Sequence, residues 1–152
     1  MKIWSTPQDV FDKLDDEFHF DIDVCADDNN AKCQMYYSRQ RGLIEDWGGV
    51  CFLNPPYGKE ISQWLKKALE VAANRDATVV CLLPVRSNPP WWHNYVMKAT
   101  EIRFVRKKLS FTGGMGVPFW GNAIVVFRKG SVGQSPAVSS WDQPRHIKEN
   151  NA

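Results

Sequence analysis

The run Val50-Cys51-Phe52-Leu53-Asn54-Pro55-Pro56-Tyr57-Gly58 carries the clearest structural signal in the chain. Its first four residues are apolar without alternation, which is typical of a strand buried on both faces of a sheet. Neither Pro55 nor Pro56 can donate a backbone hydrogen bond to a neighbouring strand, so the strand must stop at Asn54. Such a strand, leading into a helix, predicts an α/β layer fold with a mainly parallel sheet.

The helix that follows this strand is the best defined one in the sequence. Apolar side chains recur at helical spacing from Ile61 to Ala72, while lysines and glutamates take the opposite face. A second buried strand is predicted for 78–83, and Pro84 stops it. Near the N-terminus, Thr6 is predicted to cap a helix whose first residue is Pro7.

The remaining elements are less sharply defined. The late strands among them suggest an antiparallel hairpin at the edge of the sheet. We expect strands at 18–26, 102–111 and 123–127, a short helix and a weak strand within 30–37, and a short aromatic-rich helix within 88–97.

The composition fits a single globular domain. The chain has 152 residues, of which 43% are hydrophobic and 24% charged, so wholesale disorder is excluded. The net charge is only +2, so any case for a nucleic-acid partner must rest on local clusters. Residues 1–130 are expected to form the domain, and 131–152 a polar, flexible C-terminal tail.

The sequence predicts a cytoplasmic protein without a metal. The first residues contain no apolar segment of a secretory signal, and no apolar run approaches the ~20 residues that a membrane span needs. The four cysteines form no C-x-x-C pair, so we expect buried thiols in a reducing compartment rather than a zinc site. The acidic residues within 21–28 lack the glycine and the distal glutamate of a calcium loop.

The loop Asn54-Pro55-Pro56-Tyr57 is the predicted catalytic site. Ligands of open α/β sheets bind beyond the carboxyl ends of the strands, which is where this loop lies. The side-chain carbonyl of Asn54 and the backbone carbonyl of Pro55 can both accept hydrogen bonds from one amino group. Pro55 and Pro56 stiffen the loop, and Tyr57 offers a ring that can stack on a planar base.

A second copy of this pattern occurs at Asn88-Pro89-Pro90-Trp91. Four residues separate it from the strand before it, whereas the first copy follows its strand directly. We therefore assign the chemistry to Asn54-Pro55-Pro56-Tyr57, with a rigid turn without chemistry as the alternative.

A series of short segments in a fixed order resembles the small phage and prophage DNA N6-adenine methyltransferases of the Dam type. The resemblance covers 1–130 and includes Trp4-Ser5-Thr6-Pro7, Phe20–Ala26, Asn30–Cys33, Asp46-Trp47, Phe52–Gly58, Leu82–Pro84 with Arg86, Trp91-Trp92 and Gly121-Asn122-Ala123. It implies a Rossmann-like methyltransferase sheet with S-adenosylmethionine as the methyl donor. It also implies that the Asn54 loop holds an adenine that has been flipped out of the duplex.

The resemblance further implies where the methyl donor binds. Asp23 would accept hydrogen bonds from the ammonium group of its methionine part, and Asp46 would contact its adenosine part. The complete set of residues expected to bind the cofactor is Trp4, Thr6, Pro7, Asp23, Cys25, Ala26 and Asp46.

DNA is the expected partner, and a basic segment late in the chain is the expected place of contact. Phosphate contacts from such a cluster would hold the duplex. A glycine-rich segment containing Gly113, Gly114 and Gly116 would cover the target base. The predicted DNA-binding residues are Arg86, Trp91, Trp92, Arg106, Lys107 and Lys108.

Two other functions are compatible with the same residues. The amine could be an RNA base or a protein glutamine side chain, or the chain could be a catalytically inactive DNA-binding module with the same fold. The resemblance suggests a role in restriction and modification, as protection of phage DNA from a host. The sequence leaves the recognition site and the oligomeric state open.

Overall fold

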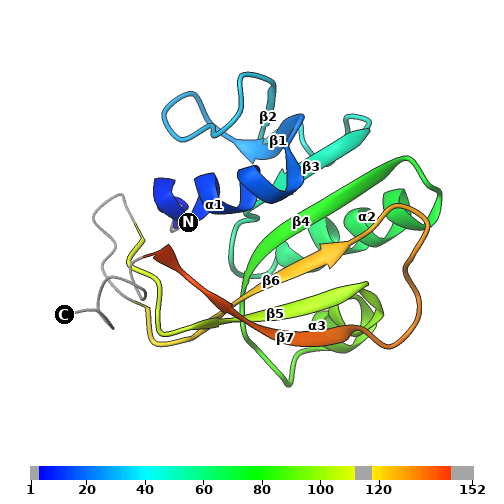
Figure 1. Ribbon diagram of the computed structural model, residues 1–152. Coiled ribbons are helices and arrows are strands. Elements are labelled where there is room, and N and C mark those ends of the chain that lie inside the picture. The colour runs from blue at the N-terminus through cyan, green and yellow to red at the C-terminus, as the bar shows by residue number, and fades with distance from the viewer. Residues whose placement is uncertain (1–3, 112–117, 145–152) are drawn as a thin grey trace.

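The computed structural model describes residues 4–111 and 118–144 (Figure 1). Its helices are α1 (Gln8–Phe18), α2 (Ile61–Ala73), α3 (Pro90–Asn94) and the 3₁₀ helix η1 (Val96–Lys98). Its strands are β1 (Ile22–Ala26), β2 (Tyr36–Ser38), β3 (Gly49–Leu53), β4 (Ala77–Pro84), β5 (Glu101–Arg106), β6 (Asn122–Phe127) and β7 (Ala137–Asp142).

The strands form one seven-stranded sheet in the order β2-β1-β3-β4-β6-β5-β7. Strand β6 runs antiparallel to both of its neighbours, β4 and β5, and every other described pair is parallel. The predicted α/β fold with a mostly parallel sheet is therefore confirmed, and it is consistent with a Rossmann-like methyltransferase fold.

Helices cover both faces of this sheet, with α1 on one face and α2 and α3 on the other (Figure 1). Strand β4 shows how the sequence achieves this, because successive side chains of a strand point to opposite faces. Val79 and Leu83 join the core under α2, whereas Val80 and Leu82 join the core under α1. Burial on both faces explains why the strand is apolar without alternation.

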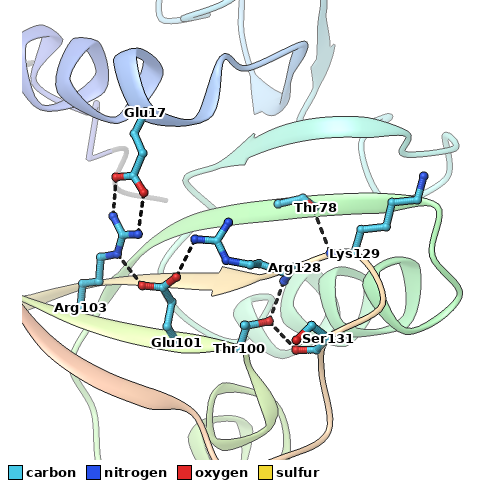
Figure 2. Close-up of polar contacts among 8 residues, drawn as sticks. All are labelled: Glu17, Thr78, Thr100, Glu101, Arg103, Arg128, Lys129 and Ser131. Carbon is cyan, nitrogen blue, oxygen red and sulfur yellow. Dashed lines mark hydrogen bonds and ion pairs between the residues drawn. The ribbon is translucent and has the colours of Figure 1, made fainter.

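Helix α1 is fastened to the sheet by ion pairs at the amino ends of the parallel strands (Figure 2). Arg103 on β5 donates two hydrogen bonds to the Glu17 carboxylate, at 2.6 and 2.7 Å. It also donates to Glu101 at 2.7 Å, and Glu101 accepts a further bond from Arg128 at 2.7 Å. The hydrogen bonds from Arg103 hold the pKa of Glu17 below its usual value. Arg103 therefore stabilises the packing of α1 against the sheet.

Two predictions in the N-terminal half are wrong in detail. The N-cap of α1 is Pro7, and no side chain caps the helix there. The hydroxyl of Thr6 is instead used by Asn54, as described below. Within 30–37 no helix forms, because the Asp27 carboxylate accepts hydrogen bonds from the backbone N–H groups of Asn29 and Asn30 (2.8 and 3.0 Å) and closes a turn.

Two predicted strands are shorter than expected. Strand β1 begins at Ile22 rather than at residue 18, because Phe18 ends α1 and His19 takes a left-handed conformation with φ of 54°. Strand β5 stops at Arg106 because Lys107 has φ of 63°, which turns the chain out of the sheet.

The segment expected to be a flexible tail contributes a strand. Strand β7 pairs in parallel with β5 from Ala137 to Asp142 and forms the edge of the sheet. The late hairpin of β5 and β6 is therefore internal rather than at the edge. The segment looks polar because most of its side chains face solvent, and Trp141 alone in the strand is buried, at 7% exposure. Backbone pairing, which the composition does not reveal, holds the strand.

Gln143 follows β7 and fixes the turn after β5. Its buried amide nitrogen donates to the carbonyl oxygens of Arg106 and Lys107, at 3.0 and 3.3 Å. All four cysteines are free. None of the helices in the described ranges is both long and apolar enough to cross a membrane.

The assignment of β7 to the folded domain can be tested at Trp141. Replacing Trp141 by alanine should lower the free energy of unfolding by about 3 kcal/mol, because a buried indole is removed from the core under α1. Urea unfolding followed by circular dichroism measures this. Val138, 65% exposed on the same strand, is the matched control, and Val138→Ala should cost less than about 0.5 kcal/mol. Equal stability of Trp141→Ala and wild type would mean that the segment is a tail.

Candidate active site

The candidate site lies where the parallel strands β1, β3 and β4 end. A pocket opens at this edge of the sheet, and its walls come from the segment before α1, the end of β1 with the loop after it, and the loop after β3. The lining residues are Trp4, Ser5, Thr6, Asp23, Cys25, Asn30, Lys32, Arg39, Phe52, Asn54, Pro55 and Pro56.

Asn54 is held in one orientation by the segment before α1. Its amide nitrogen donates to the Trp4 carbonyl oxygen at 2.6 Å and to the Thr6 hydroxyl at 3.0 Å. Both N–H bonds are thereby used. The amide oxygen Oδ1 is buried and accepts no hydrogen bond from any described residue. A buried acceptor without a donor costs about 1–3 kcal/mol, so the site presents an oriented oxygen that a ligand N–H group can satisfy.

Asp23 lines the same pocket and is also deeply buried, at 3% exposure. Its carboxylate accepts hydrogen bonds from the backbone N–H groups of Cys25 (3.2 Å) and Lys32 (3.1 Å). No lysine or arginine in the described ranges forms an ion pair with it, and the Lys32 ammonium donates to Gln8 instead, at 3.1 Å. Burial raises the pKa of Asp23 from 3.8 to about 6, which favours a cationic ligand in this pocket.

Three pocket residues were not identified from the sequence: Asn30 and Lys32, from the loop after β1, and Arg39, which directly follows β2. Lys32 and Arg39 are basic, so the pocket offers charges of both signs around Asp23. The segment Asn30–Cys33 is part of the family resemblance, which assigns no function to it. That match is the sequence signal that could have identified Asn30 and Lys32 as pocket residues.

The other residues predicted to bind a cofactor have different positions. Trp4, Thr6 and Cys25 line the pocket. Cys25 is buried, and burial raises the pKa of its thiol far above its usual value, so it packs rather than acting as a nucleophile. Pro7 and Ala26 are buried, and their carbonyl oxygens accept backbone hydrogen bonds that fix the start of α1 and the end of β1.

Asp46 does not belong to this pocket, which corrects the prediction for it. It precedes β3 and therefore lies at the amino ends of the parallel strands, on the opposite edge of the sheet from Asn54. There it lines a separate hollow together with Asp76, which precedes β4. The sequence suggested Asp46 through its neighbour Trp47, but a strand separates it from the site.

Tyr57 lines a second cleft, adjacent to the first pocket along the chain. The cleft has a volume of about 290 Å³ and is lined by Tyr57, Gly58, Ile61, Pro84, Arg86, Asn88, Pro89 and Trp91. The Tyr57 hydroxyl donates to the Leu82 carbonyl oxygen at 3.3 Å, and the Asn122 amide approaches that hydroxyl at 3.5 Å. Burial raises the pKa of Tyr57, so its hydroxyl stays protonated. The ring is therefore fixed at its far end.

Trp120 packs against one residue from each of the two hollows, although the sequence did not single it out. Its ring packs edge-to-face against Trp4 of the pocket, at 5.2 Å between centroids, and against Tyr57 of the cleft, at 5.9 Å. The Arg86 guanidinium carbon lies 5.3 Å from the Trp120 ring centroid. Trp120 directly precedes the Gly121-Asn122-Ala123 segment of the resemblance. No sequence pattern around it predicts its contact with Tyr57.

The residues predicted to contact DNA divide into two groups. Arg86 and Trp91 line the cleft beside Tyr57. Trp92 is 5% exposed and packs in the core under α3, so its prediction as a DNA contact is wrong. The helical turn from Pro90 points adjacent indoles in different directions, which sequence adjacency cannot resolve.

The basic residues after β5 lie at the same edge as the site. Arg106 pairs with Asp142 of β7 at 2.9 Å, so part of its charge is neutralised within the fold. Lys107 and Lys108 follow where the chain leaves the sheet, and both are exposed. Gly113, Gly114 and Gly116, predicted to cover the target base, lie outside the described residues. Within 4–111 and 118–144, no group of three or more His, Cys, Asp or Glu side chains is placed to hold a metal ion.

Comparison with known proteins identifies the family. A family model described as DNA N-6-adenine-methyltransferase (Dam) matches residues 1–130. The DNA N-6-adenine-methyltransferase of Haemophilus phage HP1 is 33% identical over 107 residues, which cover 68% of this chain and 61% of that protein. The DNA N-6-adenine-methyltransferase of Escherichia phage T1 is 29% identical over 112 residues, 71% of this chain and 46% of that protein.

The matched part of the chain contains the Asn54 loop, the Asp23 pocket and Trp120. The chain spans only about half to three fifths of the length of these two relatives. The family model, by contrast, covers most of the chain. This chain belongs to the DNA N-6-adenine-methyltransferase (Dam) family.

Proposed function

We propose that the chain is a DNA adenine-N6 methyltransferase whose methyl donor is S-adenosylmethionine. The observation that carries the proposal is Asn54, whose amide nitrogen is fully used by Trp4 and Thr6 and whose buried oxygen has no described partner. An exocyclic amino group is the kind of ligand that such an acceptor needs. The family membership gives the target as adenine N6.

The pocket around Asp23 fits the amino-acid end of the methyl donor. A buried carboxylate that has two backbone donors and no ion pair with a described residue is suited to an ammonium group. Lys32 and Arg39 provide positive charge for a carboxylate in the same pocket. S-adenosylmethionine would supply a methyl group on a positively charged sulfur, and the residues named here would hold and orient it.

The chain's own residues prepare the amine. Asn54 Oδ1 and the Pro55 carbonyl would accept the two N6–H bonds, which raises electron density on the nitrogen and directs its lone pair. The ring of Tyr57 would stack on the extruded adenine, with its hydroxyl anchored to Leu82. Orientation then provides most of the acceleration, and the proton that N6 loses passes to solvent.

DNA would lie across the carboxyl edge of the sheet. Arg86 in the cleft and the exposed Lys107 and Lys108 after β5 would contact phosphates, since all three lie at the edge of the sheet where Asn54 and Tyr57 are found. Trp91, which lines the cleft, would contact the distorted strand.

The function is tested by incubating the protein with unmethylated DNA and donor carrying a labelled methyl group, followed by nucleoside analysis. We expect label in N6-methyl-2′-deoxyadenosine. Asn54→Ala should lower the rate by about a hundredfold or more, because it removes the acceptor for N6. Tyr57→Phe, which keeps the ring, should lose far less. Label only in RNA or protein would select another amine, and donor binding without transfer would leave an inactive module.

The role of Asp23 gives a pH prediction. Donor binding should weaken as the pH falls from about 7.5 to about 5, because the carboxyl, with a pKa of about 6, becomes protonated and loses its attraction for an ammonium group. Isothermal titration of S-adenosylmethionine measures this, without any turnover. Affinity that is flat across this range would exclude Asp23 as the ammonium partner.

Asp23→Asn separates this role from a structural one. A raised pKa in the folded state means that the ionised carboxylate opposes folding, a cost that grows from about pH 4 and is complete above about pH 6. Asn keeps only one oxygen for the backbone N–H groups of Cys25 and Lys32, so Asp23→Asn should cost about 1–3 kcal/mol of stability, less whatever is gained by removing the buried charge. At neutral pH, donor affinity should fall at least about tenfold, measured at a temperature where the variant is folded. Loss of stability with unchanged donor affinity would show that Asp23 only supports the fold.

DNA contact at the basic turn predicts a change in salt dependence. Lys108→Ala should weaken DNA binding and reduce the slope of log K against log salt by about one, because one phosphate contact is lost. Fluorescence anisotropy over a salt series measures the slope. Lys129 is the matched control, since it is exposed at the opposite edge of the sheet. Its backbone N–H group donates a hydrogen bond to the Thr78 hydroxyl there, at 2.9 Å (Figure 2). Lys129→Ala should leave the slope unchanged, and equal effects would contradict this docking.

A further inference from the structure

Unpaired polar atoms cluster at the candidate site. In the described ranges, the buried side-chain atoms without a hydrogen-bond partner are Asn54 Oδ1, Trp64 Nε1, Trp120 Nε1 and Asn122 Oδ1. Trp64 belongs to α2 and the core. Of the other three, Asn54 lines the pocket, Trp120 packs against Trp4 of the pocket and Tyr57 of the cleft, and Asn122 approaches the Tyr57 hydroxyl. Folded proteins pair nearly all buried polar atoms, so a group of unpaired ones at a single site indicates atoms reserved for a ligand.

Trp120 packs directly behind residues that line the pocket and the cleft. It packs against Trp4, whose carbonyl oxygen holds Asn54, and against Tyr57, the proposed stacking residue. Arg86 lies over its ring. Trp120 therefore contacts one residue that holds Asn54 and one residue proposed to stack on the base.

Asn122, two residues further on, ties the position of Trp120 to that of Tyr57. Its amide nitrogen donates to the Leu83 carbonyl oxygen at 3.1 Å and approaches the Tyr57 hydroxyl at 3.5 Å. The same short segment thus carries the Trp120 ring and anchors the Tyr57 ring. An indole fixed in this way can hold its N–H group in one direction.

The chemistry of the unpaired atoms is complementary to that of adenine. The Asn54 oxygen only accepts hydrogen bonds, and the indole N–H of Trp120 only donates them. Adenine offers donors on its exocyclic N6 and acceptors at its ring nitrogens N1, N3 and N7. We propose that the Trp120 indole N–H donates a hydrogen bond to a ring nitrogen of the target adenine, so that Trp120 helps to determine base specificity. This assignment rests on the proposed function.

Base analogues test the bond without altering the protein. The wild-type enzyme is first used to map its methylated sites in plasmid DNA, and an oligonucleotide with one such site is made with adenine, 1-deazaadenine, 3-deazaadenine or 7-deazaadenine at the target. We expect one of the three analogues to lower kcat/KM and DNA affinity by about tenfold, because it lacks the bonded nitrogen. No loss with any of them would overturn the assignment.

The variant Trp120→Phe completes the cycle, because it keeps an aromatic ring and removes the N–H group. Its kcat/KM should be about tenfold lower than that of the wild type on the adenine oligonucleotide and unchanged on the sensitive analogue. This is expected when the variant and the analogue remove the same hydrogen bond. Equal additional losses on all three analogues would mean that Trp120 acts by packing alone. Trp64→Phe removes the buried, unpaired indole N–H group of Trp64 from the core. Its kcat/KM should stay within about twofold of the wild-type value on every substrate.

The outcomes distinguish this assignment from the proposed function. Absence of methylated adenine with the wild-type protein would overturn both. Methylated adenine, together with equal activity of Trp120→Phe and wild type on the adenine oligonucleotide, would overturn the assignment of Trp120 alone.

Discussion

The site depends on the two hydrogen bonds that the Asn54 amide donates to the segment before α1. They decide which end of the amide is unpaired, and they leave the buried oxygen Oδ1 without a hydrogen bond from any described residue. The acceptors, Trp4 and Thr6, are almost fifty residues away in sequence. Their position follows from α1, which the Arg103–Glu17 pair fastens to the sheet. An ion pair at one edge of the sheet thus supports the orientation of a polar atom at the other.

The two edges of the sheet have different uses. At the amino ends of the parallel strands, the charged groups satisfy each other, as in the cluster of Glu17, Glu101, Arg103 and Arg128. At the carboxyl ends, a buried carboxylate has no ion pair with a described residue, and three polar side-chain atoms have no described partner. Proteins tolerate the free-energy cost of unpaired buried groups at sites where a bound ligand pairs with them. The distribution of unpaired groups therefore locates the site independently of any motif.

Much of this could be predicted from local sequence, but the exceptions share a cause. The apolar runs of β3 and β4, the break at Pro55 and Pro56, and the amphipathic pattern of α2 all depend on neighbouring residues, and these elements form as expected. The predictions for Asp46 and Trp92 failed because a short motif does not specify where a side chain points. Asp46 lies at the opposite end of β3 from the site, and Trp92 lies on the side of α3 that faces the core. Strand β7 was missed because an edge strand held by backbone pairing needs few apolar side chains.

The sequence by itself determined the fold class, the place where the central strand ends, and the amide, prolines and ring of the catalytic loop. Those features follow from backbone geometry and periodicity within a few residues. Only the tertiary structure decided that Thr6 accepts a hydrogen bond from Asn54 rather than capping its own helix, and that Asp23 is buried without an ion pair among the described residues. It also decided that Trp120 packs against both Trp4 of the pocket and Tyr57 of the cleft. Each of these contacts joins segments far apart in the chain, and only packing of the layers brings such segments together.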